Sequence, residues 1–517
     1  MNHVEFDNGH FDESFDVVIA GYGFGGGFAA IEAARHGAKV LICEKMPQPG
    51  GVSICSGGGV RCATNAEDAF SYLKATNAGT TPDDVLRVLA DGMAKAETYV
   101  KELVAPIDGV SVNSTEFSGK HGGNYDFPGW PTFYTTQVDV PASFDRTRLY
   151  PSVRNRPSSG GPGLFWVIEQ HLEKLKVEIR LQTPVISLIR TPDNELRGVV
   201  IDGPSGRRRV AAKRAVILAC GGFEANDSMK AQYWEGKPVL TASCRGNTGD
   251  GIRLAQALGA DLWHMWHFHG CYAFKHPDRD FPFALRVKRL PDWNPTRKND
   301  VKVPMVWIVV DQHGKRYMNE SPPYCQDMSH RPMHFMDSEA MRYPRIPSWL
   351  ISDERGRRTY QLGDVRTNDA EYHYDWSADN QKELDLGILR RAGTVEQLAT
   401  STGLDREVVA ATIARWNAQC DHGEDADFGR PPGTMVRLEP PFIFGQVWPA
   451  VSNTQGGPVH NSRQQIVDTG GNPIRRLYAA GELGSSFGHL YLSGGNIAEC
   501  VVTGWVAGRE AAAIPAW

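Results

Sequence analysis

The chain has 517 residues, of which 41% are hydrophobic and 22% charged, and its net charge is −5. This composition is typical of a globular protein with a large core, and it has no basic excess that would indicate nucleic-acid binding. No apolar run approaches the ~18 residues that a membrane-spanning helix needs, and the N-terminal segment lacks the apolar stretch of a secretory signal. Nine cysteines without C-x-x-C spacing are typical of free thiols in a reducing compartment. We therefore expect a cytoplasmic protein with no membrane span and no nucleic-acid partner.

A glycine-rich turn near the N-terminus joins a strand to a helix. Residues 17–20 read VVIA, which is long enough for a buried parallel strand. Gly21, Gly23 and Gly26 follow with G-x-G-x-x-G spacing. In such a motif the first glycine allows a tight turn, the second lets a pyrophosphate approach the backbone, and the third permits close packing of helix on strand.

An acidic residue ends the next strand. Residues 40–42 read VLI, and Glu44 lies 23 residues after Gly21, where a carboxylate can bind a ribose hydroxyl. Strand, glycines, helix, strand and acid together predict a dinucleotide-binding βαβ unit, with an ordinary βαβ unit as the alternative.

The loop after Glu44 is rich in glycine and small hydroxyl residues. Residues 49–59 read PGGVSICSGGG, and their backbone N–H groups could surround a second set of cofactor oxygens. A flexible surface loop is the alternative interpretation.

The sequence pattern changes in the middle of the chain. Residues 215–222 read AVILACGG, a buried strand running into a glycine turn, and residues 247–251 (NTGDG) begin another helix. From about residue 263 to residue 437 the chain has Pro-rich turns and fewer alternating strands and helices. We predict an α/β fold with a dinucleotide-binding domain in residues 1–270, an inserted α+β cap domain in residues 271–437, and a return to the first domain in residues 438–517.

The last eighty residues are again rich in glycine. Residues 477–482 read LYAAGE, a strand that ends in Gly-Glu. Residues 491–496 read YLSGGN and precede a small-residue helix over residues 497–512. The N-terminal N–H groups of this helix would point at an electron-rich group.

With these motifs the chain resembles the flavoprotein superfamily of fumarate reductases, succinate dehydrogenases and 3-ketosteroid dehydrogenases. The resemblance implies FAD in a split Rossmann-like domain, a cap domain that closes over the flavin, and a C-terminal helix that points at the flavin pyrimidine. No histidine for covalent attachment follows the early glycine loop in the expected way, so we expect FAD to be bound non-covalently. The residues implied at the cofactor are Gly21, Gly23, Phe24, Gly25, Gly26, Glu44, Lys45, Gly51, Ser53, Gly58, Gly222, Asn247, Asp250, Gly481, Glu482, Ser493, Asn496 and Ile497.

Two residues typical of fumarate reductases are absent. Members of that branch carry an arginine shortly before the final Gly-Gly-Asn and a histidine ahead of a T-x-G-G turn. This chain has HLYLS over residues 489–493 and SNTQGG over residues 452–457. These differences disfavour a dicarboxylate reductase.

The ketosteroid dehydrogenase branch matches better. Its 1-dehydrogenases carry a catalytic tyrosine in an Asn-Glu-Ser-x-Pro-Tyr stretch, and residues 319–324 read NESPPY. Their second tyrosine and a glycine N–H contact the substrate carbonyl, a spacing kept by Tyr491 and Gly495. The YLSG of residues 491–494 also matches the 4-dehydrogenases, so the position of the double bond stays open.

The resemblance implies an FAD-dependent dehydrogenase that desaturates a cyclic ketone such as a 3-ketosteroid or an oxocyclohexane carboxylate. Tyr324 would take the α-proton, assisted by Tyr125 or Tyr134, while Tyr491 and Gly495 would stabilise the enolate and flavin N5 would accept a hydride. The partners would be the ketone and an unidentified electron acceptor. Two alternatives are a soluble fumarate-reductase-like ene or enoate reductase and a non-catalytic flavin carrier.

Two further groups of residues could contribute to a site. His264, His267 and His269 lack the paired spacing of a zinc site, and we expect no metal. Arginines would ordinarily lie at the surface or in ion pairs, but one that faces the flavin could bind a substrate carboxylate. The candidate arginines are Arg245, Arg279, Arg286 and Arg289.

Overall fold

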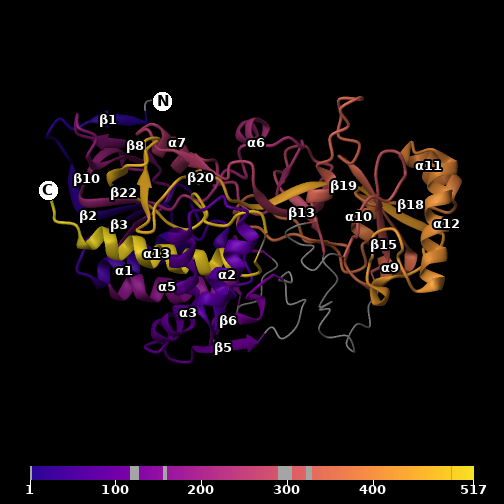
Figure 1. The fold of residues 1–517 in the computed structure, drawn as a ribbon, viewed down its shortest axis with the longest axis horizontal. Coiled ribbons are helices and arrows are strands. Elements are labelled where there is room, and N and C mark those ends of the chain that lie inside the picture. Colours follow the sequence, from indigo (N-terminus) through magenta and orange to yellow (C-terminus); the bar gives the residue numbers. More distant parts are fainter. Residues whose placement is uncertain (1–2, 117–126, 155–159, 289–304, 322–328, 491) are drawn as a thin grey trace.

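The computed structural model describes residues 3–116, 127–154, 160–288, 305–321, 329–490 and 492–517. It has a mixed α/β architecture with two large sheets (Figure 1). Within the described residues, no helix is both long and apolar enough to cross a membrane.

The first sheet carries the N-terminal βαβ unit. Its parallel centre pairs β10 with β2, β2 with β3, and β10 with β22, and the strand segments there are buried and apolar. Antiparallel β8 and β9 extend it. The strands are β1 (Val4–Phe6), β2 (Glu13–Ala20), β3 (Val40–Cys43), β7 (Glu178–Arg180), β8 (Val185–Arg190), β9 (Leu196–Gly203), β10 (Gly206–Leu218), β21 (Gln465–Val467) and β22 (Pro473–Ala479).

Helices cover one face of this sheet, and two of them pack very closely. A Cβ atom at Gly504 or Gly508 of α13 would lie 2.8 Å from the carbonyl oxygen of Gly25 or 2.4 Å from that of Ala29, both on α1. Figure 1 shows α13 alongside α1 beneath the strands. The helices of this part of the chain are α1 (Phe24–Arg35), α2 (Ala66–Asn77), α3 (Asp83–Val104), α4 (Arg146–Leu149), α5 (Gly161–Lys174), α6 (Asp227–Tyr233), α7 (Asp250–Gln256) and α13 (Gly495–Ala513), of which α6 and α7 pack in the core on the opposite face of the sheet. The helix expected over residues 497–512 is α13.

The second sheet spans both ends of the expected cap domain. Its order is β15-β16-β19-β13-β14-β17, with β11 and β18 paired to β19. The strands are β11 (Leu240–Thr241), β13 (Phe268–Lys275), β14 (Ala284–Val287), β15 (Trp307–Val310), β16 (Ser348–Asp353), β17 (Gly363–Asp364), β18 (Arg390–Ala392) and β19 (Phe442–Thr454). Strand β19 follows the boundary expected at residue 437 yet pairs with β13 and β16, so the division into domains stays a prediction.

Smaller elements complete the fold. Strands β4 (Val60–Ala63), β5 (Ser111–Glu116) and β6 (Phe133–Asp139) form one small sheet, and β12 (Leu262–Trp263) pairs with β20 (Gly457–Pro458). Helices α9 (Glu354–Thr359), α10 (Gln381–Asp385), α11 (Val395–Thr402) and α12 (Arg406–His422) lie around the second sheet (Figure 1).

Candidate active site

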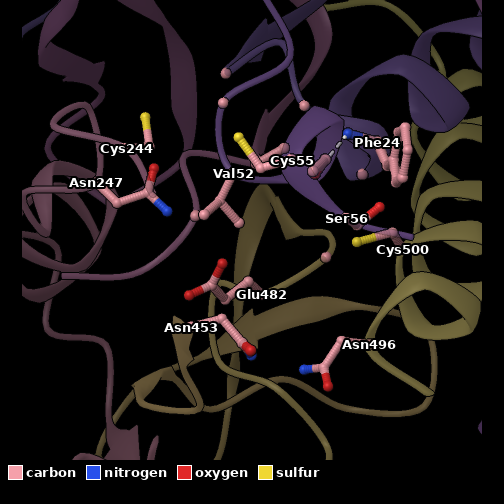
Figure 2. Close-up of a pocket in the computed structure, with 18 of the residues that line it drawn as sticks. Phe24, Val52, Cys55, Ser56, Cys244, Asn247, Asn453, Glu482, Asn496 and Cys500 are labelled. Carbon is pink, nitrogen blue, oxygen red and sulfur yellow. Dashed lines mark hydrogen bonds between the residues drawn. The ribbon is translucent and has the colours of Figure 1, made fainter. Parts of the chain in front are cut away.

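A cavity of about 440 Å³ lies where β2, β3, β10 and β22 end. Its wall includes the ends of the glycine turns, the loop after β3 and the start of α13. Figure 2 shows Glu482, Asn453 and Asn496 from the C-terminal part of the chain across from Val52 and Cys55 of the early loop. Ligands of open α/β sheets bind at the carboxyl ends of the parallel strands, which is where this cavity lies.

The turn between β2 and α1 needs glycine at two positions. A Cβ atom at Gly21, where φ is +107°, would lie 2.2 Å from the carbonyl oxygen of Ala219. A Cβ atom at Gly26 would lie 2.1 Å from the carbonyl oxygen of Gly21, so Gly26 permits the close helix packing rather than lining the cavity. The N–H of Phe24 donates to Ser53 Oγ at 3.2 Å. The N-terminus of α1 therefore meets the glycine-rich loop of residues 49–59 at the cavity wall. This arrangement is suited to binding a phosphate group.

The acidic residue after β3 is held by the backbone. Glu44 lines the cavity and accepts N–H bonds from Tyr22 at 2.9 Å and Met46 at 2.8 Å. Burial is the main cause that raises the pKa of Glu44. Two N–H bonds leave further lone pairs on this carboxyl group for a ribose hydroxyl. Lys45 and Asp250 also line the cavity, and they pair with each other at 2.5 Å.

Most of the residues expected at the cofactor do line the cavity. They are Gly21, Gly23, Phe24, Gly25, Glu44, Lys45, Gly51, Ser53, Asn247, Asp250, Gly481, Glu482, Ser493, Asn496 and Ile497. Gly26, Gly58 and Gly222 are not among the described lining residues. Gly58 packs against the start of α5, since its Cβ atom would lie 2.4 Å from the carbonyl carbon of Gly160. Gly222 packs against β19, since its Cβ atom would lie 1.7 Å from Thr454 Oγ1.

The expected catalytic residues are only partly described. Tyr324 and Tyr491 lie outside the described residues, as do Tyr125 and Arg289. Gly495 begins α13, but its N–H donates to the carbonyl oxygen of Leu492 at 2.7 Å, and it is not among the lining residues. Tyr134 donates to Glu97 of α3 at 2.6 Å and is also not a described lining residue.

Several lining residues were missed by the sequence analysis. Ser452 and Asn453 lie at the end of β19, and Arg366 follows β17. Among the described residues, Ser452 Oγ, Asn453 Nδ2 and Arg366 Nε are buried atoms without a hydrogen-bond partner. A polar ligand in the cavity would supply such partners. The SNTQGG motif of residues 452–457 is the signal in the sequence that could have identified this turn.

The histidines near the site are engaged with one another and with the backbone. His264 bonds to the carbonyl oxygens of Ser485 at 2.8 Å and Thr80 at 3.0 Å. His267 and His269 are 3.2 Å apart between their Nε2 atoms, and burial is the main cause that lowers the pKa of His269 to about 3. No group of three potential ligands that could hold a metal ion occurs within the described part of the chain.

Known proteins similar to this chain include both dehydrogenases and reductases. A 3-oxosteroid 1-dehydrogenase of Mycolicibacterium smegmatis is 26% identical, with 98% of each chain covered. A probable fumarate reductase of Shewanella frigidimarina is 25% identical, with 97% of this chain and 75% of the relative covered. The fold resembles a crystal structure of 3-ketosteroid delta1-dehydrogenase from Sterolibacterium denitrificans in complex with 1,4-androstadiene-3,17-dione. That match has a TM-score of 0.78 and 22% identity, and it covers 97% of this chain and 99% of the other.

The family model described as "FAD binding domain" matches residues 16–497, which include the glycine turn, the second loop and the start of α13. A dinucleotide such as FAD suits this cavity wall. The wall offers the glycine turn after β2, the N-terminus of α1 and Glu44, together with the buried polar atoms described above that have no hydrogen-bond partner. The chain belongs to this FAD-binding family of oxidoreductases.

Proposed function

We propose that this oxidoreductase is a dehydrogenase that introduces a C=C bond next to the carbonyl group of a cyclic ketone. One observation carries the proposal: the YLSG sequence of residues 491–494 runs directly into the start of α13, where Ser493, Asn496 and Ile497 line the cavity. A tyrosine hydroxyl at that place is suited to donate to a substrate oxygen. The 26% identity to a 3-oxosteroid 1-dehydrogenase over nearly the whole chain supports the same chemistry.

The residues of the cavity wall would hold FAD non-covalently. The N-terminus of α1 with Gly51 and Ser53 would bind phosphate oxygens, and Glu44 would bind a ribose hydroxyl. Bound FAD supplies the acceptor for the hydride at flavin N5. Ser493, Asn496 and Ile497 at the start of α13 would lie near the flavin ring.

Tyr324 and Tyr491 would handle the proton and the developing charge. Tyr324 would take the α-proton, and Tyr491 would donate to the carbonyl oxygen as the enolate forms. A tyrosine with an ordinary pKa of about 10 is about three units from being half ionised at neutral pH, so catalysis should accelerate toward alkaline pH. The Gly495 N–H would have to exchange its bond to Leu492 for one to the substrate, so Tyr491 would be the main donor.

The first prediction concerns how FAD is attached. The purified protein is expected to be yellow and to release FAD into solution on acid denaturation, because no histidine for covalent attachment follows the early glycine loop as expected. Chromatography of the supernatant measures this. Recovery of FMN, or flavin that stays with the precipitated protein, would contradict it.

The cavity wall also bears on the class of ketone. Arg286 on β14 and Arg366 line the cavity. Arg245 is not among the described residues that line it, and its guanidinium group pairs with Asp369 at 2.6 Å. Arg366 pairs with Asp364 at 2.5 Å. Arg286 and Arg366 place two guanidinium groups at the cavity wall, where they could bind a carboxylate, so we favour an oxocyclohexane carboxylate over an uncharged steroid.

The second prediction tests this choice. Arg286→Gln is expected to raise KM for a carboxylated cyclic ketone by about 10–100-fold, because a hydrogen bond to a charged group contributes about 1.5–3 kcal/mol. KM for an uncharged ring ketone should stay unchanged and is the internal control. Equal losses with both ketones would show that Arg286 does not recognise the carboxylate.

A reductase acting on an enone or enoate is the second candidate, because the probable fumarate reductase matches 97% of this chain. An assay with an artificial electron acceptor over a panel of cyclic ketones tests the dehydrogenase. Products that lack two hydrogen atoms support it. Reoxidation of the reduced protein by enones or enoates, with no ketone turned over, would establish the reductase instead. Residence in the cytoplasm remains a proposal that rests on the cysteines, for which no disulfide is seen among the described residues.

A further inference from the structure

Two carboxyl groups meet behind the cavity wall. Glu482 follows β22 and lines the cavity, and Glu224 is buried in the turn after β10. A Cβ atom at Gly222 would lie 2.6 Å from Glu482 Oε1 and 2.9 Å from Glu224 Oε2. Glycine at residue 222 therefore leaves room for two carboxyl groups that approach the same point from different parts of the chain. Figure 2 shows the Glu482 carboxyl group at the cavity, on the same side as Asn453.

The hydrogen bonds around the pair leave one oxygen without a donor. Glu482 Oε1 accepts from the Thr454 N–H at 2.8 Å and from Thr454 Oγ1 at 3.2 Å. Glu224 Oε1 accepts from Asn247 Nδ2 at 3.0 Å. Among the described residues, no N–H or O–H group donates to Glu224 Oε2, which is buried. A proton held between the two carboxyl groups would satisfy this oxygen.

The charges around the pair do not replace that proton. Lys230 of α6 is the cation whose field reaches Glu224, but its Nζ is bound to Asp227 at 2.8 Å and to the Val239 carbonyl at 2.8 Å. Across the cavity, Lys45 is paired with Asp250 at 2.5 Å, and Glu44 adds a further acid. Two like charges in contact cannot both ionise cheaply in a buried place. Burial raises the pKa of Glu224 to about 7, and burial together with Glu224 raises the pKa of Glu482 well above its usual range.

We propose that Glu224 is a positioning residue that shares one proton with Glu482, and that this proton is required for tight FAD binding. The proton keeps Glu482 in place against Glu224 and Thr454, and it leaves the cavity wall with one negative charge fewer. Loss of the proton would set two carboxylates against each other and turn a second negative charge toward the pyrophosphate of the cofactor. This inference depends on the FAD-binding family alone and stands whichever substrate the enzyme uses.

The proposal fixes the sign of a pH dependence. FAD bound in the cavity would cover Glu482 and bring negative charge, so the pKa of the shared proton should be higher with FAD bound than without it. The affinity for FAD is then highest below the pKa that the shared proton has in the free protein. It falls as the pH rises above that value, and it levels off above the pKa that the proton has in the complex. Within that window a single linked proton changes the dissociation constant by up to about tenfold per pH unit.

The experiment measures FAD binding to the apoprotein by flavin fluorescence from mildly acidic to alkaline pH. Glu224→Gln keeps a donor for Glu482 and an acceptor for Asn247 but cannot lose a proton, so its affinity should stay at the acidic value of the unmodified protein at every pH. Glu499→Gln is the matched control. Glu499 of α13 is bound by Ser485 Oγ at 2.7 Å and the Ser486 N–H at 2.6 Å, and burial raises its pKa to about 7. This variant should retain the pH dependence of the unmodified protein.

A pH dependence that persists in Glu224→Gln would overturn the proposal, and so would one that disappears in Glu499→Gln. Calorimetry of FAD binding to the unmodified protein in two buffers of different ionisation enthalpy gives a second test that needs no variant. We expect proton uptake on binding at pH values within the window. Binding without proton uptake throughout the pH range would overturn the proposal even if Glu224→Gln failed to fold.

Discussion

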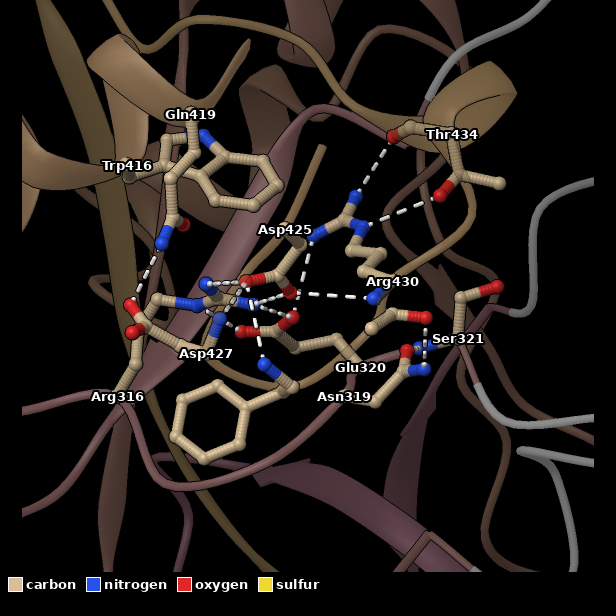
Figure 3. A network of polar contacts seen from close by, with 12 residues as sticks. Arg316, Asn319, Glu320, Ser321, Trp416, Gln419, Asp425, Asp427, Arg430 and Thr434 are labelled. Atoms are coloured by element: carbon tan, nitrogen blue, oxygen red, sulfur yellow. Dashed lines mark hydrogen bonds and ion pairs between the residues drawn. The ribbon is translucent and has the colours of Figure 1, made fainter. Parts of the chain in front are cut away.

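Replacing Glu320 by glutamine is expected to lower the free energy of unfolding by about 3–5 kcal/mol, the usual cost of removing one partner from a buried ion pair. Glu320 is fully buried and accepts from Arg316 at 2.8 and 3.0 Å and from Arg430 at 3.3 Å. Asp425 is the second acid, 3.0 Å from Arg316. Figure 3 shows these two acids and two arginines in one network. Glutamine at residue 320 would leave a net positive charge buried among them.

The network also ties together distant parts of the chain. Arg430 donates to the carbonyl oxygens of Trp307 at 2.6 Å and Thr434 at 2.9 Å, and Glu320 accepts the Val309 N–H at 3.0 Å. Glu320 therefore holds the segment of residues 319–321 against β15. Chemical denaturation of the holoprotein measures the loss in stability.

The same substitution at an exposed ion pair is the control. Glu67 binds Arg87 at 2.6 Å, but its side chain is 70% exposed, so Glu67→Gln should change stability far less. Equal stability of Glu320→Gln and the unmodified protein would show that the buried network does not need its full complement of charges.

Replacing Tyr491 by phenylalanine is expected to slow desaturation by about 10²–10³, the effect of removing one donor to an oxyanion. Substrate binding should weaken less than the rate falls, because the oxygen is most negative in the transition state. Tyr324→Phe should lose most of the rate as well, since it removes the proposed base. Steady-state kinetics on the best ketone, with the flavin content of each variant measured alongside, tests both residues.

A third tyrosine provides the matched control. The Tyr134 hydroxyl donates to Glu97 on α3 and is not among the described lining residues, so Tyr134→Phe should keep the rate of the unmodified enzyme. If Tyr324→Phe and Tyr491→Phe also kept near-normal turnover with full flavin content, the ketone mechanism would be wrong.

The local part of the site was predictable from the sequence. Gly21, Gly26 and Glu44 belong to one continuous βαβ unit whose glycine spacing and apolar strands follow from backbone sterics. The glycines of residues 494 and 495 also marked the approach to α13, although the helix begins at Gly495 and not at the expected residue 497.

The parts of the site formed by distant segments were not predictable. Arg366 and Ser452 reach the cavity because the second sheet pairs β14 with β17 and β13 with β19, and no local pattern specifies those partners. The roles of Gly58 and Gly222 were also hidden, since each touches a segment remote in sequence, Gly160 or Thr454. Spacing identified these glycines as special without showing whether they contact the ligand or the protein.

The most direct test of the proposed function is anaerobic mixing of the oxidised yellow holoprotein with cyclic ketones in the absence of any other electron acceptor. A desaturating enzyme should lose its flavin colour with at least one ketone and yield one equivalent of the enone, which lacks two hydrogen atoms. If no ketone bleached the flavin, while enones or enoates restored the colour of the chemically reduced protein, the enzyme would be a reductase and the proposed function would be wrong.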